Sequence, residues 1–280
     1  MKFKLDKKQK RALAFPWRKL SSSLRTLPDF IIIGAPKCGT SSLYYYLSQH
    51  PQIKPCIKKE INFFNGGKDP NIDAYAEGLN WYRAFFPLNL GRQQRFLTGE
   101  ASTLYMFNPL VPERIHKHLP DIKLIALLRN PVTRAHSQYF HELRKGRENL
   151  SMMDAFLAEE NRISKALKEN DYRSPDLLNY SYLKKGLYAE QLERYFQYFS
   201  RDQVFVLQSE FFFRKTNEAM KLVWNFLDVE QNFFVPDLTT KQKGKNKKTM
   251  NEDVLAYLRS FYKQPNERLF DLLGTSFDWN

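Results

Sequence analysis

Apolar residues form two kinds of pattern that alternate along the chain. Three short, unbroken runs each predict a strand buried on both faces: residues 30–33, 124–128 and 204–207. Four longer stretches have apolar residues at helical spacing: residues 40–49, 132–144, 187–199 and 217–227. Buried strands that alternate with amphipathic helices predict an α/β fold, with a central parallel sheet and helices on both faces.

Two segments interrupt this alternation. Residues 66–80 are rich in Gly, Asn and Asp, which predicts a loop. Residues 146–180 form a charged insertion, in which Ser151 and Asp154 can cap a helix. Such excursions often shape the acceptor pocket of an α/β enzyme.

The first 25 residues carry nine Lys or Arg and one acid, Asp6, with apolar Leu13, Phe15, Trp17 and Leu20 between them. The favoured interpretation is a partly ordered, solubilising tail. An arm that binds weakly to a membrane surface or to a polyanion is the alternative. We therefore divide the chain into a basic extension, residues 1–28, and one domain, residues 29–280.

Charge and cysteine content narrow the functional classes. The 280 residues are 42% hydrophobic, as expected of a globular protein, and carry a formal charge of +14. This charge favours an anionic partner, whether nucleic acid, membrane, polysaccharide or phosphorylated cofactor. The two cysteines, Cys38 and Cys56, predict a reducing, cytoplasmic environment, and the longest apolar runs are too short to span a bilayer.

A glycine-bracketed loop, "GAPKCGTSS", joins the first predicted strand to the first predicted helix. Backbone N–H groups and the helix dipole favour an anion at such a junction. A Walker A loop has Lys directly after its second Gly, but Thr40 follows Gly39 here. The strand at 124–128 is followed by Arg129, where a magnesium-binding acid would stand. The pattern favours direct anion binding, with a nucleotide kinase and a noncatalytic polyanion-binding protein as alternatives. None of the five histidines has zinc-site spacing, so no metal is expected.

At this loop the chain resembles the sulfotransferases that use 3′-phosphoadenosine 5′-phosphosulfate (PAPS), and is most similar to their heparan-sulfate-type and bacterial carbohydrate branch. The resemblance continues through "KKEINFF", "GEASTLYMFNP", "LIALLRNPVTRAHSQY", "YLKKGLYAEQLERY" and "KQKGK". It implies transfer of a sulfuryl group from PAPS to an acceptor hydroxyl of a carbohydrate, with an amine as the less favoured alternative, and release of adenosine 3′,5′-bisphosphate. It implies no specific nucleic-acid partner.

The resemblance also assigns the residues that bind PAPS. The 5′-phosphosulfate is implied to contact Lys37, Cys38, Gly39, Thr40, Ser41 and Ser42. A lysine there can stabilise the charge that develops on the leaving-group oxygen. The 3′-phosphate is implied to contact Arg129 and Ser137, together with Lys243, Gly244 and Lys245 of the Lys-rich loop 241–248.

In the resembling family, the Glu of a "KE" pair followed by two aromatic residues is the general base, which implies this role for Glu60. Three positions depart from the heparan-sulfate enzymes. Asn62 and Asn65 replace a His and an acid, and Ala101 replaces an acceptor-side Lys. These departures argue against heparan sulfate itself as the acceptor, and they leave the predicted PAPS site unchanged.

Overall fold

A computed structural model describes residues 6–69, 71–89, 96–241 and 249–279, with only the backbone described at 7–12. Four strands form one sheet: β1 (Phe30–Gly34), β2 (Gly99–Ala101), β3 (Lys123–Leu128) and β4 (Val204–Gln208). Their order is β2-β1-β3-β4, and every neighbouring pair is parallel. All five residues of β1 are buried. The predicted α/β fold with a parallel sheet is therefore confirmed.

Strand β2 was not predicted from the sequence. Phe30 of β1 pairs with Gly99 on one side and with Lys123 on the other. A Cβ atom on Gly99 would lie 2.4 Å from the Phe30 ring, so the close approach of the two strands requires glycine at position 99.

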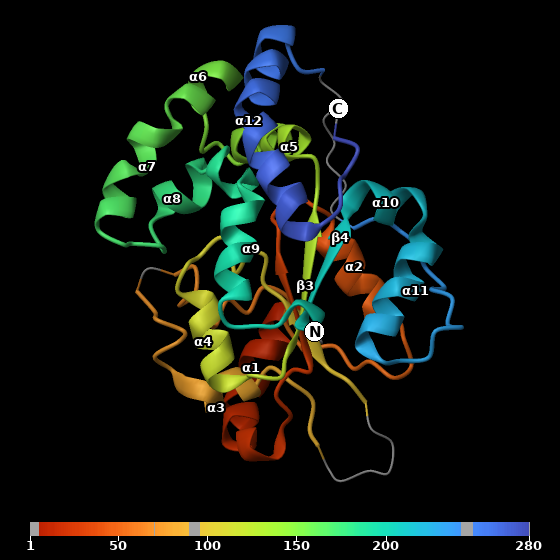
Figure 1. Cartoon of the computed structure of the whole chain (residues 1–280). Helices are drawn as coiled ribbons and strands as arrows, with labels where there is room; N and C mark the ends of the chain where they lie inside the picture. Colours follow the sequence, from red (N-terminus) through yellow and green to blue (C-terminus); the bar gives the residue numbers. More distant parts are fainter. Residues whose placement is uncertain (1–5, 70, 90–95, 242–248, 280) are drawn as a thin grey trace.

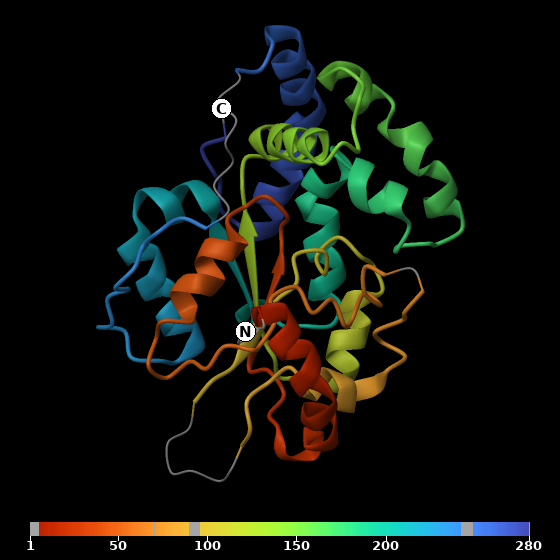
Figure 2. The same cartoon turned by 180° about the vertical axis from the view of Figure 1, so that it is seen from behind.

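Helices cover both faces of the sheet (Figures 1 and 2). One face is covered by α2 (Thr40–Leu47), α10 (Ser209–Arg214) and α11 (Thr216–Leu227), and the other by α4 (Val111–His118) and α9 (Tyr188–Phe196). Helix α5 (Pro131–Arg144) crosses above the carboxyl ends of the strands, and α12 (Glu252–Leu273) packs against α5 and α9. No described helix is long and apolar enough to cross a membrane.

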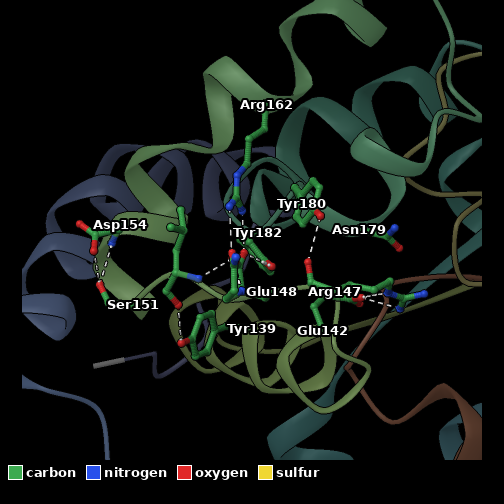
Figure 3. Close-up of polar contacts among 12 residues, drawn as sticks. Tyr139, Glu142, Arg147, Glu148, Ser151, Asp154, Arg162, Asn179, Tyr180 and Tyr182 are labelled. Carbon is green, nitrogen blue, oxygen red and sulfur yellow. Dashed lines mark hydrogen bonds and ion pairs between the residues drawn. The ribbon is translucent and has the colours of Figure 1, made fainter.

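The charged insertion folds into three short helices, α6 (Met152–Leu157), α7 (Glu159–Lys168) and α8 (Pro175–Tyr180). The predicted cap at the start of α6 is confirmed, because Ser151 accepts a hydrogen bond from the Asp154 N–H. Figure 3 shows how the insertion is fastened: the buried Glu148 carboxylate pairs with Arg162 at 2.6 Å and accepts the Tyr182 hydroxyl at 2.8 Å. The Glu148–Arg162 pair joins two parts of the insertion, and the Tyr182 hydrogen bond joins the insertion to the chain that follows it.

Residues 7–20 form helix α1 (Lys7–Leu20), where the favoured interpretation was a partly ordered tail. The Phe15 ring packs against Trp81 of α3 (Gly78–Arg83) and against Phe85, with centroid distances of 5.9 and 4.8 Å. Helix α1 is therefore docked on the body of the protein. Most of segment 66–80 consists of turns and loop, as expected, until α3 begins at Gly78.

Candidate active site

A cleft of about 1310 Å³ lies where β1 and β3 end. Most of the residues assigned from the sequence line it: Lys37, Gly39, Thr40, Ser41, Glu60, Arg129 and Ser137. Cys38 and Ser42 are fully buried and are not among the lining residues of the described chain. Lys243, Gly244 and Lys245 lie outside the described residues, whereas Thr240 and Lys241, just before them, line the cleft.

The glycine loop has a backbone that brings the start of α2 to the cleft. Gly39 is the N-cap of α2 and has φ of 96°, in the left-handed region that favours glycine. A Cβ atom at this position would also lie 2.6 Å from the Phe213 ring, so glycine is required for space as well as for conformation. The first N–H groups of a helix have no hydrogen-bond acceptor within the helix. Gly39, Thr40 and Ser41, at the start of α2, line this cleft, so an anion there can accept such N–H groups.

Lys37 is the main cation of the loop, and its surroundings are strongly positive. Burial lowers the pKa of Lys37 to about 8, and repulsion from Arg144, Arg129 and Arg134 adds to the shift, while Glu142 opposes it. A bound anion would relieve this repulsion. The site around Lys37 is thus suited to a ligand with several negative charges.

Arg129 follows β3 directly and is held by its neighbours. Its Nε donates to Thr133 Oγ1 at 2.9 Å, and its Nη1 lies 3.4 Å from the Lys37 carbonyl oxygen. Pro131 occupies the first helical position of α5, as expected, and Ser137 lies further along the same helix on the cleft wall. A guanidinium and a hydroxyl on one side of the cleft can bind a phosphate group.

Contacts between α2 and residues 238–241 hold Lys241, the first residue of the Lys-rich loop, at the same cleft. The Lys241 N–H donates to Ser42 Oγ at 2.9 Å, and the Lys241 ammonium lies 3.7 Å from the centroid of the Tyr45 ring. Tyr46 donates its hydroxyl to the Leu238 carbonyl at 2.7 Å. Ser42 therefore contacts the chain that leads into the loop.

Glu60 lines the same cleft as the glycine loop. Its carboxylate oxygens lie 3.3 Å from Lys59 Nζ and 3.1 Å from Lys68 Nζ, and Thr103 Oγ1 donates to one of them at 3.1 Å. Burial alone would raise the pKa of Glu60, but Lys68 and Lys59 outweigh it, so the pKa is lowered. Glu60 is therefore a carboxylate at neutral pH.

The turn that carries Glu60 has an unusual backbone. Glu60 and Asn62 have φ of 58° and 57°, a region that non-glycine residues seldom adopt. The Glu60 N–H donates to the Ala101 carbonyl at 2.9 Å, and the Asn62 N–H donates to Ser102 Oγ at 3.0 Å. The chain that continues β2 thus fixes the direction in which Glu60 points.

Glu100 of β2 supports this turn and was not singled out from the sequence. Its fully buried carboxylate accepts three hydroxyl hydrogen bonds, from Tyr82 at 2.7 Å, Tyr105 at 2.9 Å and Ser102 at 2.6 Å. Burial raises the pKa of Glu100 to about 7 despite these donors. Because Ser102 and Tyr105 also accept the backbone N–H groups of Asn62 and Phe64, Glu100 orients both hydroxyls that hold the Glu60 turn.

Basic side chains from α5 and the insertion line the rest of the cleft. They are His141, Arg144, Lys145, Arg147 and Arg173, together with Lys185 just after the insertion. Burial and then Lys37, Lys145 and Arg144 lower the pKa of His141 to about 4, so the histidine is neutral at physiological pH and the cations around it are not. Within the described ranges, no three His, Cys, Asp or Glu side chains gather as a metal site would require.

Comparisons with known proteins agree with this geometry. The chain is 26% identical to the membrane-associated sulfotransferase kil1 of Dictyostelium discoideum, over 93% of this chain and 68% of that protein. It is 27% identical to heparan sulfate glucosamine 3-O-sulfotransferase 5 of Mus musculus, over 96% and 82% of the two chains.

A sulfotransferase from Alicyclobacillus acidocaldarius has a similar structure, with a TM-score of 0.71 and 34% identity over 90% of this chain and 98% of that one. The model of the sulfotransferase domain family matches residues 27–260, which include β1 to β4 and the whole described cleft wall. The family uses PAPS as its sulfuryl donor, and the match decides against the kinase and noncatalytic alternatives. The chain belongs to the sulfotransferase domain family and is a PAPS-dependent enzyme.

Proposed function

We propose that this protein transfers the sulfuryl group of PAPS to a hydroxyl of an anionic carbohydrate. The observation that carries the proposal is a single cleft with three chemically distinct parts: the Lys37 loop, the Glu60 carboxylate, and a basic wall from α5 and the insertion. The first two parts suit sulfuryl transfer, and the third suits an acceptor that already carries negative charge.

The described cleft fits PAPS by the chemistry of its donors. Cations and hydroxyls stand at two places, the glycine loop and the Arg129–Ser137 wall, which suits a nucleotide with anionic groups at its 5′ and 3′ positions. The lowered pKa of Lys37 supports the same fit, because a multiply charged anion would offset the repulsion around it. Lys243, Gly244 and Lys245 remain proposed 3′-phosphate contacts outside the described residues.

Each residue then has a defined task. PAPS supplies the activated sulfuryl group and a phosphate as its leaving group. Lys37 neutralises the charge that accumulates on the leaving phosphate oxygen, and Arg129 with Ser137 holds the nucleotide. Glu60 accepts the proton of the acceptor hydroxyl, once that hydroxyl replaces one of the lysines at its carboxylate.

The acceptor is proposed from the basic wall and from the relatives' chemistry. The murine relative is named for heparan sulfate glucosamine, which is an anionic carbohydrate unit. In this chain Asn62 and Asn65 are buried, and the Asn62 amide donates to the Glu60 carbonyl at 2.8 Å, so neither residue lines the described cleft. We therefore propose an anionic carbohydrate other than heparan sulfate. Both cysteines are buried and free, which supports a reducing, cytoplasmic location.

Recognition of the 3′-phosphate can be tested by calorimetry. Arg129→Ala is expected to weaken binding of adenosine 3′,5′-bisphosphate by about 1.5 to 3 kcal/mol, because a charge-assisted hydrogen bond is lost. Binding of adenosine 5′-phosphate, which lacks the 3′-phosphate, should change little and serves as the matched control. If the variant lost affinity for both nucleotides equally, Arg129 would not bind the 3′-phosphate.

An acceptor assay with radiolabelled PAPS tests the acceptor class. Carboxylated or partly sulfated oligosaccharides should accept sulfate better than neutral oligosaccharides of equal length or simple phenols. Lys145→Ser should raise KM for the anionic acceptor by about two- to fivefold, as expected for one exposed cation, without changing bisphosphate affinity. Lys168→Ser, an exposed lysine of α7 outside the cleft lining, is the control. A preference for neutral acceptors, unaffected by Lys145→Ser, would contradict the proposal.

A further inference from the structure

One face of α1 carries large apolar side chains in contact with water. Leu13, Trp17 and Leu20 are 63%, 74% and 78% exposed, and Leu24 in the 3₁₀ turn Ser22–Leu24 is 56% exposed. Their spacing of four and three residues places Leu13, Trp17 and Leu20 on the same side of α1, and Leu24 follows in the next turn of the chain. We call this set the α1 apolar face.

The opposite side of α1 is attached to the protein, so the apolar face cannot turn inward. Arg18 donates from Nε to the Ala84 carbonyl at 2.6 Å and from Nη2 to the Phe86 carbonyl at 2.7 Å. Phe15 packs against the Trp81 and Phe85 rings on the same side. The helix is thus held with one side docked and its apolar face directed to solvent.

The charge of the N-terminal segment selects the kind of partner. Of the nine Lys or Arg in residues 1–25, six precede the α1 apolar face in the sequence, at positions 2–11, and the segment has a single acid. The other three contact the protein: Arg18 and Arg25 donate to backbone carbonyls, and Lys19 pairs with Glu77. A second copy of this chain would bring the same positive charge to the contact, which disfavours self-association through this face. An anionic surface would be attracted, and Trp is the side chain most typical of the boundary between lipid tails and headgroups.

We propose that α1 is an interfacial membrane helix, which inserts Leu13, Trp17, Leu20 and Leu24 into the headgroup region of an anionic lipid surface. Several leucines with one tryptophan on one face, within a strongly basic segment, is the pattern of helices that lie in the plane of a membrane. This proposal rests on α1 alone and does not depend on the proposed acceptor.

The position of α1 gives the proposal a consequence for access to the cleft. In Figures 1 and 2, α1 lies at the lower end of the molecule, whereas α5 and α12 lie at the upper end. The catalytic cleft is lined by α5 and the carboxyl ends of the strands, so it stands at the end away from α1. A protein bound through α1 would keep its cleft directed toward the aqueous phase.

Sedimentation of the full chain with lipid vesicles tests the proposal. We expect binding to vesicles of phosphatidylcholine with phosphatidylserine, and much weaker binding to pure phosphatidylcholine or at high salt. The triple variant Leu13→Ser, Trp17→Ser, Leu20→Ser should weaken binding by about tenfold or more, because its apolar contact area is lost. Leu157→Ser in α6, which alters a leucine that is 59% exposed elsewhere, is the matched control.

A spectroscopic measurement separates insertion from simple charge attraction. Brominated lipids should quench part of the tryptophan fluorescence of the wild-type protein. Trp17→Phe should abolish most of this quenching while the protein still sediments with the vesicles, because Trp81 packs under Phe15 on the docked side of α1, and Trp224 and Trp279 are buried. Unchanged bisphosphate affinity of the triple variant would show that it is folded.

Three results would overturn the proposal. The first is equal vesicle binding by the triple variant and the Leu157→Ser control. The second is a concentration-dependent dimer that the triple variant abolishes, without vesicle binding by the wild type, which would make the face a contact between copies. The third is binding of an acidic protein instead of vesicles, if the triple variant loses this binding.

Discussion

Replacing Glu60 with Gln is expected to lower the rate of sulfuryl transfer by roughly 10²- to 10⁴-fold, the usual contribution of a general base. Gln keeps the shape of the side chain, and its carbonyl oxygen can still accept the Thr103 hydroxyl, which lies 3.1 Å from Glu60. It cannot take a proton from the acceptor. Affinity for adenosine 3′,5′-bisphosphate should stay within a few-fold, and turnover with radiolabelled PAPS and calorimetry measure the two effects separately.

Two neighbouring carboxylates serve as controls for this experiment. Asp69 and Asp73 stand in the same segment of the chain, but their carboxylates accept the backbone N–H groups of Asn71 and Tyr75 at 3.0 and 2.9 Å. Asp69→Asn and Asp73→Asn should therefore leave turnover close to that of the wild type. If either change abolished transfer while Glu60→Gln did not, the base would be misassigned.

The pH profile gives a further test of the Glu60 assignment. Because Lys68 and Lys59 lower the pKa of Glu60, the carboxylate form persists to lower pH than for an ordinary glutamate. The rate should fall only as pH drops through this lowered pKa. Lys68→Ala removes one of the two cations, so the acid limb should move to higher pH. If the acid limb of the pH profile did not move in Lys68→Ala, a group other than Glu60 would control it.

The elements predicted from the sequence are those whose buried residues follow a simple local pattern of apolar positions. Strands β1, β3 and β4 are continuous apolar runs because both faces of the sheet are covered. Helix α5 was expected at 132–144 and spans Pro131–Arg144, because its apolar residues recur at helical spacing and a proline precedes them.

Other parts depend on partners that are distant in the sequence. Strand β2 has only three residues, and one hydrogen-bond partner of its buried central Glu100 is Tyr82, eighteen residues earlier. No local pattern of apolar residues predicts such a strand. Helix α12 was not predicted either. It contains Pro265, and a proline usually marks the end of a helix rather than its interior.

The site was predictable to a similar extent. The glycine loop is one continuous segment, so its residues and a family resemblance are enough to predict an anion-binding role for it, and the structure places most of its residues in the cleft. Glu60 contacts Lys68, eight residues later in the chain, and Thr103, forty-three residues later. Both contacts depend on the turn at Asn62. The basic wall likewise unites α5 with the insertion only after folding. Chemistry carried by one segment was visible in the sequence, whereas electrostatics shared between segments was not.

Lys37→Ala is expected to lower turnover by roughly 10²- to 10³-fold, as for removal of one group that stabilises developing charge. Bisphosphate affinity should fall less, by about tenfold, because the interaction is strongest in the transition state. Lys37→Arg, which keeps the charge, should recover part of the lost rate.

The pKa of Lys37 is lowered to about 8, so its ammonium form is present below that pH and is lost above it. Consequently kcat/KM of the wild type should fall as pH rises through about 8, and this limb should vanish in Lys37→Arg, whose guanidinium stays protonated. Equal losses of turnover and bisphosphate affinity in Lys37→Ala would instead make Lys37 a residue that only binds the nucleotide.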